Sequence, residues 1–206
     1  MLDLTQAPIT LVLLIVNVIV SLYVLQRRPQ LIDRLSFRPD RIRRGEFYRL
    51  VTAGFVHVNG AHLLVNMLTL YFFGPLLEYV LGPVGYLILY FGSDLAAHGL
   101  SLIFHYRNAR YSAVGASGAI SGLVFAFCLY APFEMLYIFF AIPIPAIVFA
   151  IGFVAISMYA MRRRDPHRTG GLAHEAHLGG ALGGVIITML LDASALPRFL
   201  YQLGLS

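Results

Sequence analysis

The sequence predicts an all-α membrane protein, in which a single domain over residues 1–206 forms a six-transmembrane-helix bundle with an interfacial first loop. Hydrophobic residues make up 59% of the 206 residues and charged residues 12%, against roughly 45–50% and 25% in soluble domains. A soluble core of this size cannot bury so much apolar surface, whereas a bilayer allows the outer face of every helix to be apolar. The apolar residues also gather into six stretches, most of them near the ~20 residues that a spanning helix needs.

Residues that stop helices separate the six stretches. They cover approximately residues 8–25, 61–81, 84–104, 115–132, 135–161 and 173–191. Arg27, Arg28 and Pro29 follow the first stretch, and Gly82 and Pro83 divide the second from the third. The first stretch lacks the basic segment and the small-residue cleavage site of a signal peptide, so we expect it to remain as a membrane span.

The fifth stretch contains two prolines, Pro143 and Pro145, that make a continuous helix unfavourable. We therefore expect irregular backbone over residues 137–145 and a helix from about Ala146. Irregular backbone at membrane depth has to be buried by protein or to line a wet cavity, because its polar groups need partners.

Residues 27–60 form the longest connection and hold eight of the 15 basic residues, all of which are arginine. Aromatic and aliphatic residues are mixed with these arginines, which is typical of a segment at the membrane interface. A solvated basic loop is the alternative. Because the arginines lie between apolar runs, and not on one amphipathic surface, we expect no nucleic-acid partner. The lipid bilayer, through its anionic headgroups, is the partner that they favour.

Ser117 lies in a run of small residues, from Gly115 to Gly122, at the start of the fourth stretch. The free N–H groups of a helix start can stabilise a developing oxyanion, and the glycines leave room for a substrate carbonyl. These features make Ser117 a candidate nucleophile just below one membrane surface. A packing role alone is the alternative, because Gly118 and Gly122 form a G-x-x-x-G pair, and the two roles are compatible.

His177 opens the sixth stretch, just before two overlapping pairs of glycines at positions 179 and 183 and positions 180 and 184. Such pairs allow close helix packing, and the fourth stretch offers a matching small face. Close packing of the two stretches would bring His177 to the depth of Ser117, where neutral histidine can act as the base that a serine hydroxyl needs. A histidine bonded to a carbonyl at the helix end is the alternative.

His62 and Asn66 are four residues apart and therefore share one face of the second stretch. An asparagine amide that points at a nascent oxyanion is a recognised stabiliser. Interhelical hydrogen bonding is the alternative use of these side chains.

A metal site is the rival use of the histidines. His174, Glu175 and His177 resemble the H-E-x-x-H string of zinc proteases but are one residue short, which misplaces the glutamate base. We therefore expect neither a metal nor another cofactor. The single cysteine, Cys128, can form no internal disulfide.

Taken together, these motifs resemble the rhomboid family of intramembrane serine proteases. The motif H-x4-H-x3-N over residues 57–66, G-x-S-G from Gly115 and A-H-x-G-G from Ala176 follow one another in the family's order. Tyr48 and Arg49 are similar to the aromatic–arginine pair of the family's first loop. Residues 73–78 and 139–146 resemble the end of its second span and the approach to its fifth.

The resemblance implies a rhomboid-like fold in which Ser117 is the nucleophile and His177 the general base of a dyad without a carboxylate. It implies an oxyanion hole formed by Asn66, His62 and the N–H of Ser117, and no cofactor. The implied substrates are single-span or multi-span membrane proteins, cut within their transmembrane helices. We expect an integral, multi-pass protein of the bacterial inner or plasma membrane.

Two carboxylates within the apolar stretches are not expected to complete a triad. Glu78 lies ~24 Å along the helix from His62, near the opposite surface. Asp94 is in the middle of the third stretch, which is too deep, and it is four residues from His98, so we expect these two to satisfy each other.

Ser121 departs from the family pattern, because the position four residues after the nucleophile is often aromatic there and packs on the catalytic histidine. Another group therefore has to hold the His177 ring, or the activity is weaker. The charge distribution also departs from it, because 14 of the 15 arginines lie on the side of the expected catalytic mouth and only Arg198 on the other. Positive-inside reasoning places the mouth in the cytoplasm, whereas the resemblance implies that it opens outward. Reporter fusions to the C-terminus and to residues 162–168 distinguish the two orientations.

Two other functions compete with proteolysis. A catalytically inactive rhomboid-like protein that binds transmembrane helices would use the same packing faces, although the chain retains all of the dyad and oxyanion residues. A small transporter or metal carrier would use Asp94, His98, His62 and His177, but the six stretches show no inverted repeat in their hydropathy.

Overall fold

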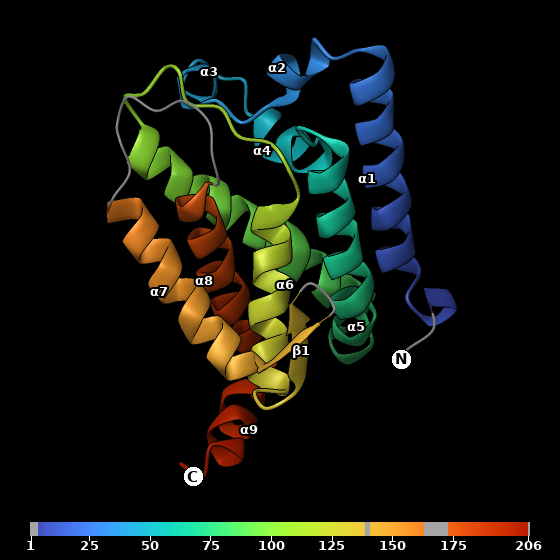
Figure 1. Cartoon of the computed structure of the whole chain (residues 1–206), viewed down its shortest axis with the longest axis vertical. Helices are drawn as coiled ribbons and strands as arrows, with labels where there is room; N and C mark the ends of the chain where they lie inside the picture. Colours follow the sequence, from blue (N-terminus) through green and yellow to red (C-terminus); the bar gives the residue numbers. More distant parts are fainter. Residues whose placement is uncertain (1–3, 139–140, 163–172, 206) are drawn as a thin grey trace.

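The structure, a computed structural model, describes residues 4–138, 141–162 and 173–205. Phe139, Phe140 and the arginines at positions 163, 164 and 168 lie outside the described residues. Elsewhere the chain is mostly helical (Figure 1). The elements in chain order are η1 (Leu4–Gln6), α1 (Pro8–Arg27), α2 (Leu31–Leu35), α3 (Pro39–Ile42), α4 (Arg49–Thr52), η2 (Ala53–Phe55), α5 (Gly60–His105), α6 (Ser117–Tyr130), β1 (Met135–Ile138), β2 (Ile142–Pro145), α7 (Ala146–Arg162), α8 (His174–Leu191) and α9 (Ala195–Gln202).

The longest helix, α5, consists of two arms that fold back against each other. Gly82 lies at φ 71° and ψ 166°, which is not helical, and Pro83 follows it. A backbone at this φ and ψ strongly favours glycine, which has no Cβ to clash. Gly74 on the first arm lies so close to Tyr86 on the second that an added Cβ would come 2.7 Å from the tyrosine oxygen. The chain therefore reverses where the sequence predicts the second stretch to end.

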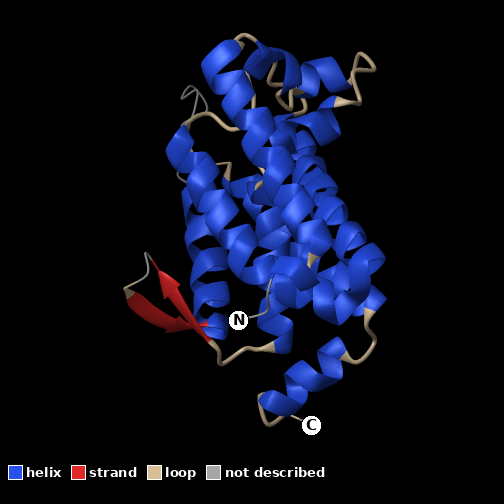
Figure 2. Ribbon diagram, turned by 90° about the vertical axis from the view of Figure 1, so that its right-hand side faces the viewer, coloured by secondary structure: helices blue, strands red, loops and turns tan. Residues whose placement is uncertain are grey.

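Three of the described helices, α1, α5 and α8, are long and apolar enough to cross a membrane on length and composition. The apolar helices α6 and α7 have 14 and 17 residues, which correspond to ~21 and ~26 Å of helix rise. The protein thus has several apolar helices, while the count of six spans stays a prediction. The sequence did not predict α9, which lies beyond the end of α8 (Figure 2).

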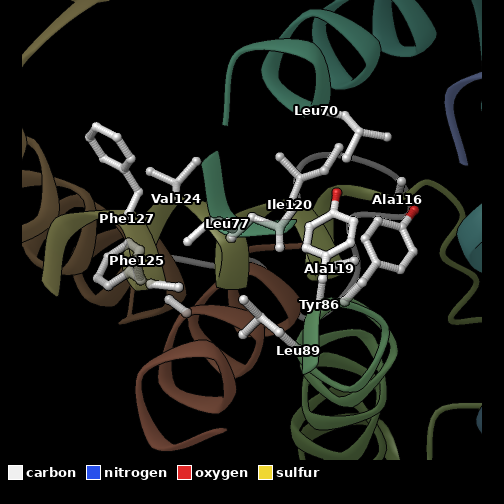
Figure 3. Packing of buried hydrophobic residues seen from close by; sticks show 14 of the residues in the cluster. Leu70, Leu77, Tyr86, Leu89, Ala116, Ala119, Ile120, Val124, Phe125 and Phe127 are labelled. Carbon is white, nitrogen blue, oxygen red and sulfur yellow. The ribbon is translucent and has the colours of Figure 1, made fainter. Parts of the chain in front are cut away.

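The central helix of the bundle is α6, and every residue from Gly118 to Leu129 is buried. Its apolar side chains pack with Leu77, Leu89 and other core residues of α5 (Figure 3). Large apolar side chains on the outer helices are exposed instead. Ile19, Ile103 and Leu190 are 62%, 73% and 80% exposed. An apolar exterior around a closely packed interior is the arrangement that a bilayer favours.

The described backbone before α7 is non-helical, as predicted, but β1 (Met135–Ile138) and β2 (Ile142–Pro145) pair as a β-hairpin where irregular backbone was expected, so the mostly helical fold includes two short strands. The strands β1 and β2 are antiparallel, with Met135 opposite Pro145 and Ile138 opposite Ile142. Pairing between the strands satisfies backbone groups that the prolines exclude from a helix. The hairpin projects from the bundle (Figure 2), and α7 begins at Ala146 as predicted.

The short helices α2, α3 and α4 fold over the end of the bundle at which α6 and α8 begin (Figure 1). Arg49 fixes this first loop from inside. Its side chain is buried, bonds Glu46 Oε2 at 2.7 Å and donates to the carbonyls of Asp33 and Ser36 at 2.8 and 2.9 Å. The loop is therefore an ordered cap on the bundle, and its position at a membrane interface stays a prediction.

Candidate active site

Ser117 and His177 lie in hydrogen-bonding contact. Ser117 is the first residue of α6, and His177 is in the first turn of α8. Although the two residues are 60 positions apart, Ser117 Oγ lies 2.9 Å from His177 Nε2. The hydroxyl can donate this bond when Nε2 carries no proton, which is the state that a general base requires.

Backbone contact between α6 and α8 brings the two residues together. A Cβ on Gly180 would collide with the backbone of Gly118, and a Cβ on Gly184 would collide with the backbone of Gly122. Only glycine at these positions allows the two helices to approach so closely. The matching small-residue faces noted in the sequence therefore meet each other, and the contact begins one residue after Ser117.

The second pair of glycines in α8 faces a different helix. Gly179 and Gly183 both lie against Ala96 in the second arm of α5, where an added Cβ would collide with that residue. Neighbouring positions on a helix point ~100° apart, so the overlapping pairs serve two neighbours at once. This arrangement wedges α8 between α5 and α6 and fixes its rotation.

A tight turn at Gly115 leads into Ser117. Gly115 has φ 120°, a conformation that L side chains rarely adopt, and a Cβ there would also collide with the ring of His62. Its N–H donates to the carbonyl of Ala53 at 2.9 Å. The turn starts α6 abruptly, so the N–H groups of its first turn have no acceptor within the helix.

His62 and Asn66 lie on one face at the start of α5. Asn59 caps this helix, because its Oδ1 accepts the N–H of His62 at 2.8 Å. The His62 ring packs on Gly115 and is thus beside the turn that leads to Ser117. Asn66 is buried, and its Nδ2 donates to the carbonyl of His62 at 3.0 Å, which leaves a second amide N–H for another acceptor.

His57 is buried behind the same turn, and sequence reasoning gave it no role beyond the family motif. Its Nδ1 lies 2.8 Å from Ser21 Oγ of α1, and its Nε2 lies 3.4 Å from the amide nitrogen of Ala116. Burial, and next the charge of His62, lower the pKa of His57 to about 3. The imidazole is therefore neutral at physiological pH and can accept a hydrogen bond.

Phe153 of α7 supplies an aromatic contact to His177. The ring centroids are 6.2 Å apart, within the range of aromatic pairs. Ser121 stands where the family often has an aromatic residue, and its hydroxyl bonds back to the carbonyl of Ser117 at 2.8 Å. An aromatic ring on a different helix, that of Phe153, thus packs on His177, where Ser121 provides none.

Hydrogen bonds of Glu175 anchor the first turn of α8 to residues outside this helix. Its side chain is buried, and Oε1 accepts the hydroxyl of Tyr111 at 2.7 Å and lies 2.9 Å from His105 Nε2. The rings of His105 and Tyr111 stack at 3.7 Å. From the sequence, Glu175 was interpreted only as part of a zinc-like string. No local pattern predicts that His105 and Tyr111, which are distant in the sequence, contact its carboxylate.

Asp94 and His98 lie within ion-pair distance, as expected, but His98 has a closer partner. Asp94 Oδ2 lies 3.7 Å from His98 Nδ1, and that nitrogen instead bonds the carbonyl of Leu50 at 3.0 Å. Asp94 Oδ1 would lie only 3.2 Å from a Cβ on Gly118. Asp94 therefore lies beside the first turn of α6. The sequence-based prediction placed Asp94 too deep, because α5 extends past the residue at which α6 begins.

No group of three or more histidine, cysteine, aspartate or glutamate side chains among the described residues could hold a metal ion. Around Ser117 the histidines instead take part in hydrogen bonds and ring contacts, as His57 and His177 do.

The comparisons with known proteins place the chain in a family. Residues 44–194 match the Rhomboid domain, and the chain belongs to the rhomboid family. It is 35% identical over 153 residues to Rhomboid-like protein 11, chloroplastic, of Arabidopsis thaliana, which covers 71% of this chain and 53% of that protein. It is 32% identical over 141 residues to Rhomboid protein 1, mitochondrial, of Saccharomyces cerevisiae, which covers 66% of this chain and 40% of that protein.

RHOMBOID-like protein 12, mitochondrial, of Arabidopsis thaliana is 29% identical over 157 residues, which covers 69% of this chain and 46% of that protein. The chain thus matches about half the length of these relatives. With its several apolar helices, it is an integral, multi-pass membrane protein.

Proposed function

We propose that this protein is an intramembrane serine endopeptidase, which cleaves transmembrane helices of single-span or multi-span membrane proteins with a Ser117–His177 dyad. The contact of 2.9 Å between Ser117 Oγ and His177 Nε2 carries the proposal. Membership of the rhomboid family supports it. The bacterial inner or plasma membrane is the location that we propose.

Acylation begins when Ser117 Oγ attacks the carbonyl carbon of the scissile peptide bond. His177 Nε2 takes the hydroxyl proton as the Oγ–C bond forms, and the carbonyl electrons move to oxygen. The tetrahedral intermediate then collapses and the C–N bond breaks, with the Nε2 proton passing to the leaving amine. The product is an ester of Ser117, with neutral His177 restored.

The oxyanion of this intermediate needs donors that are already in place. The N–H of Ser117 belongs to the first turn of α6, where helix geometry provides no internal acceptor. The second amide N–H of Asn66 and the ring of His62, which packs on Gly115, are the side-chain donors that we assign to it. Removal of one such donor typically slows catalysis by ~10²–10³-fold.

Hydrolysis of the ester repeats the chemistry with water as the nucleophile. His177 Nε2 takes a proton from the water as it attacks the ester carbonyl, and returns that proton to Ser117 Oγ when the C–Oγ bond breaks. The site lies at the end of the bundle over which α2, α3 and α4 fold (Figure 1). We propose that water and the end of a substrate helix both reach it from this end.

The test is co-expression with a single-span substrate tagged at both ends. We expect the wild-type chain to produce cleaved substrate and the variants Ser117→Ala and His177→Ala to produce none. Ser121→Ala is the matched control, because this serine lies on the same helix and its hydroxyl only bonds the carbonyl of Ser117. Equal cleavage by wild type and Ser117→Ala would contradict the proposal. Stable substrate binding without cleavage would instead favour a helix-binding protein.

A further inference from the structure

The hydroxyl of Ser21 has two hydrogen-bond partners, the carbonyl of Phe55 and the ring of His57. Ser21 Oγ donates to the carbonyl of Phe55 at 3.0 Å, and that carbonyl can only accept. A hydroxyl has one proton, so towards His57 Nδ1, 2.8 Å away, Ser21 must accept. The proton of the neutral His57 ring is therefore on Nδ1, and Nε2 carries a lone pair.

The lone pair on His57 Nε2 faces the N–H of Ala116 at 3.4 Å. Ala116 immediately precedes Ser117, and the N–H of its neighbour Gly115 donates to the carbonyl of Ala53. Ser21, His57 and Ala116 are all fully buried, so no solvent competes for these bonds. If the proton were on Nε2, two buried donors would face each other and the bond to Ala116 would be lost.

We propose that Ser21 and His57 are positioning residues, in which Ser21 fixes the tautomer of His57 so that His57 holds the backbone turn that presents Ser117. The inference rests on the proposed function and assigns a role to a residue of α1, which touches neither member of the dyad. It couples the first helix to the nucleophile through one ring.

The chemistry of the ring supports this assignment. Burial, followed by the charge of His62, lowers the pKa of His57 to about 3, so protonation does not interrupt the arrangement at ordinary pH. The ring of His62 contacts that of His57 edge-on, with centroids 5.0 Å apart and an angle of 69° between the ring planes. His62 therefore packs on the edge of the arrangement without supplying either of its bonds.

The first experiment compares the rate of fluorophosphonate labelling, and cleavage kinetics, for wild type, Ser21→Ala and Ser21→Thr. We expect Ser21→Ala to lower kcat by about 3- to 10-fold, the scale of one lost hydrogen bond, with KM unchanged. Ser21→Thr keeps the hydroxyl and should restore the rate. Thr188→Val is the matched control, because it removes an equally buried hydroxyl that only bonds Gly184 of its own helix.

The second experiment reads the tautomer directly, from ¹⁵N spectra of the histidine rings with His57→Gln to assign the signal. We expect a neutral ring protonated on Nδ1 in wild type and a mixture of tautomers in Ser21→Ala. A ring protonated on Nε2 in wild type overturns the inference, whatever the activity. Unchanged kcat in Ser21→Ala also overturns it. A wild-type chain that never labels contradicts the proposed function instead, so the two failures are distinguishable.

Discussion

Gly180 of α8 lies directly against the backbone of Gly118 of α6, one residue after Ser117. No side chain separates the two helices at this point. The position of α6 therefore closely determines the position of α8 and of His177 on it. The separation of Ser117 and His177 is thus a property of helix packing as much as of the two side chains.

The variant Gly180→Ala should separate the dyad. The added methyl group meets backbone, which cannot move aside as a flexible side chain can, so α8 must shift. We expect the labelling rate at Ser117 to fall by on the order of 10²-fold, because small misplacements of a reacting group are costly. Stability should fall by about 1–3 kcal/mol in thermal unfolding.

Gly152→Ala is the control, because nothing lies within 4 Å of a Cβ added at this α7 position. A Gly180→Ala variant that labels at the wild-type rate would contradict the packing account.

The variant Gly115→Ala should abolish labelling. The substitution places an L residue at φ 120° and drives a methyl group into the His62 ring beside the nucleophile turn. Gly45→Ala separates the two effects, because Gly45 has φ 97° but open space around its Cβ. We expect both variants to lose about 1–2 kcal/mol of stability through backbone strain, and only Gly115→Ala to lose activity. Loss of activity in both would assign the effect to strain alone.

The variant Glu78→Gln should destabilise the bundle without changing kcat. Glu78 caps α1 from another helix, since its carboxylate accepts the N–H groups of Ile9 and Thr10 at 2.9 and 2.7 Å and the Thr10 hydroxyl at 2.8 Å. Loss of the charge at a buried helix N-terminus costs about 1–3 kcal/mol. Thermal unfolding in detergent measures the loss, with the exposed Glu134→Gln as the control. A changed kcat at unchanged KM would show that α1 reaches the site through Glu78 as well.

Much of the bundle follows from local patterns in the sequence. Apolar stretches ending at Gly82 and Pro83 predicted the reversal within α5, and Pro143 and Pro145 predicted the late start of α7. The hairpin before α7 was not predictable from the prolines, because they forbid a helix without specifying what replaces it.

The contacts around Ser117 are less predictable, because they join distant positions. The small-residue faces of α6 and α8 indicated that these two helices pack together, but not that only one pair of glycines in α8 faces α6 while the other pair faces α5. Ser21 and His57 are 36 residues apart, so no helical or strand periodicity relates their positions. The predicted depth of Asp94 was wrong for a related reason, because it depends on where α6 begins relative to α5.

Acid should destabilise the wild-type chain partly through His57. The pKa of His57 is about 3 in the folded chain and near its ordinary value of 6.5 when unfolded. The unfolded chain therefore binds this proton first, and stability falls as the pH drops from about 6.5 towards 3. We expect the thermal midpoint of His57→Gln to depend less steeply on pH over this window than that of wild type. Equal slopes would show that His57 is solvated or charged in the fold.

The variant Phe153→Ala should loosen the His177 ring. The aromatic contact is of the kind that contributes about 0.5–1.5 kcal/mol, so we expect kcat to fall several-fold with KM unchanged. Phe149→Ala is the control, because this residue contacts the Phe153 ring at 5.9 Å from the same helix. Adding Ser121→Phe should recover part of the loss by providing a ring from α6. Equal effects of Phe149→Ala and Phe153→Ala would argue for general packing of α7.

Treating the purified protein with a fluorophosphonate and mapping the adduct by peptide mass spectrometry tests the Ser117–His177 dyad most directly. We expect one adduct, on Ser117 Oγ, that is absent in Ser117→Ala and forms at least ~10²-fold more slowly in His177→Ala. Equal labelling of wild type and Ser117→Ala, or an adduct on another serine, would contradict it.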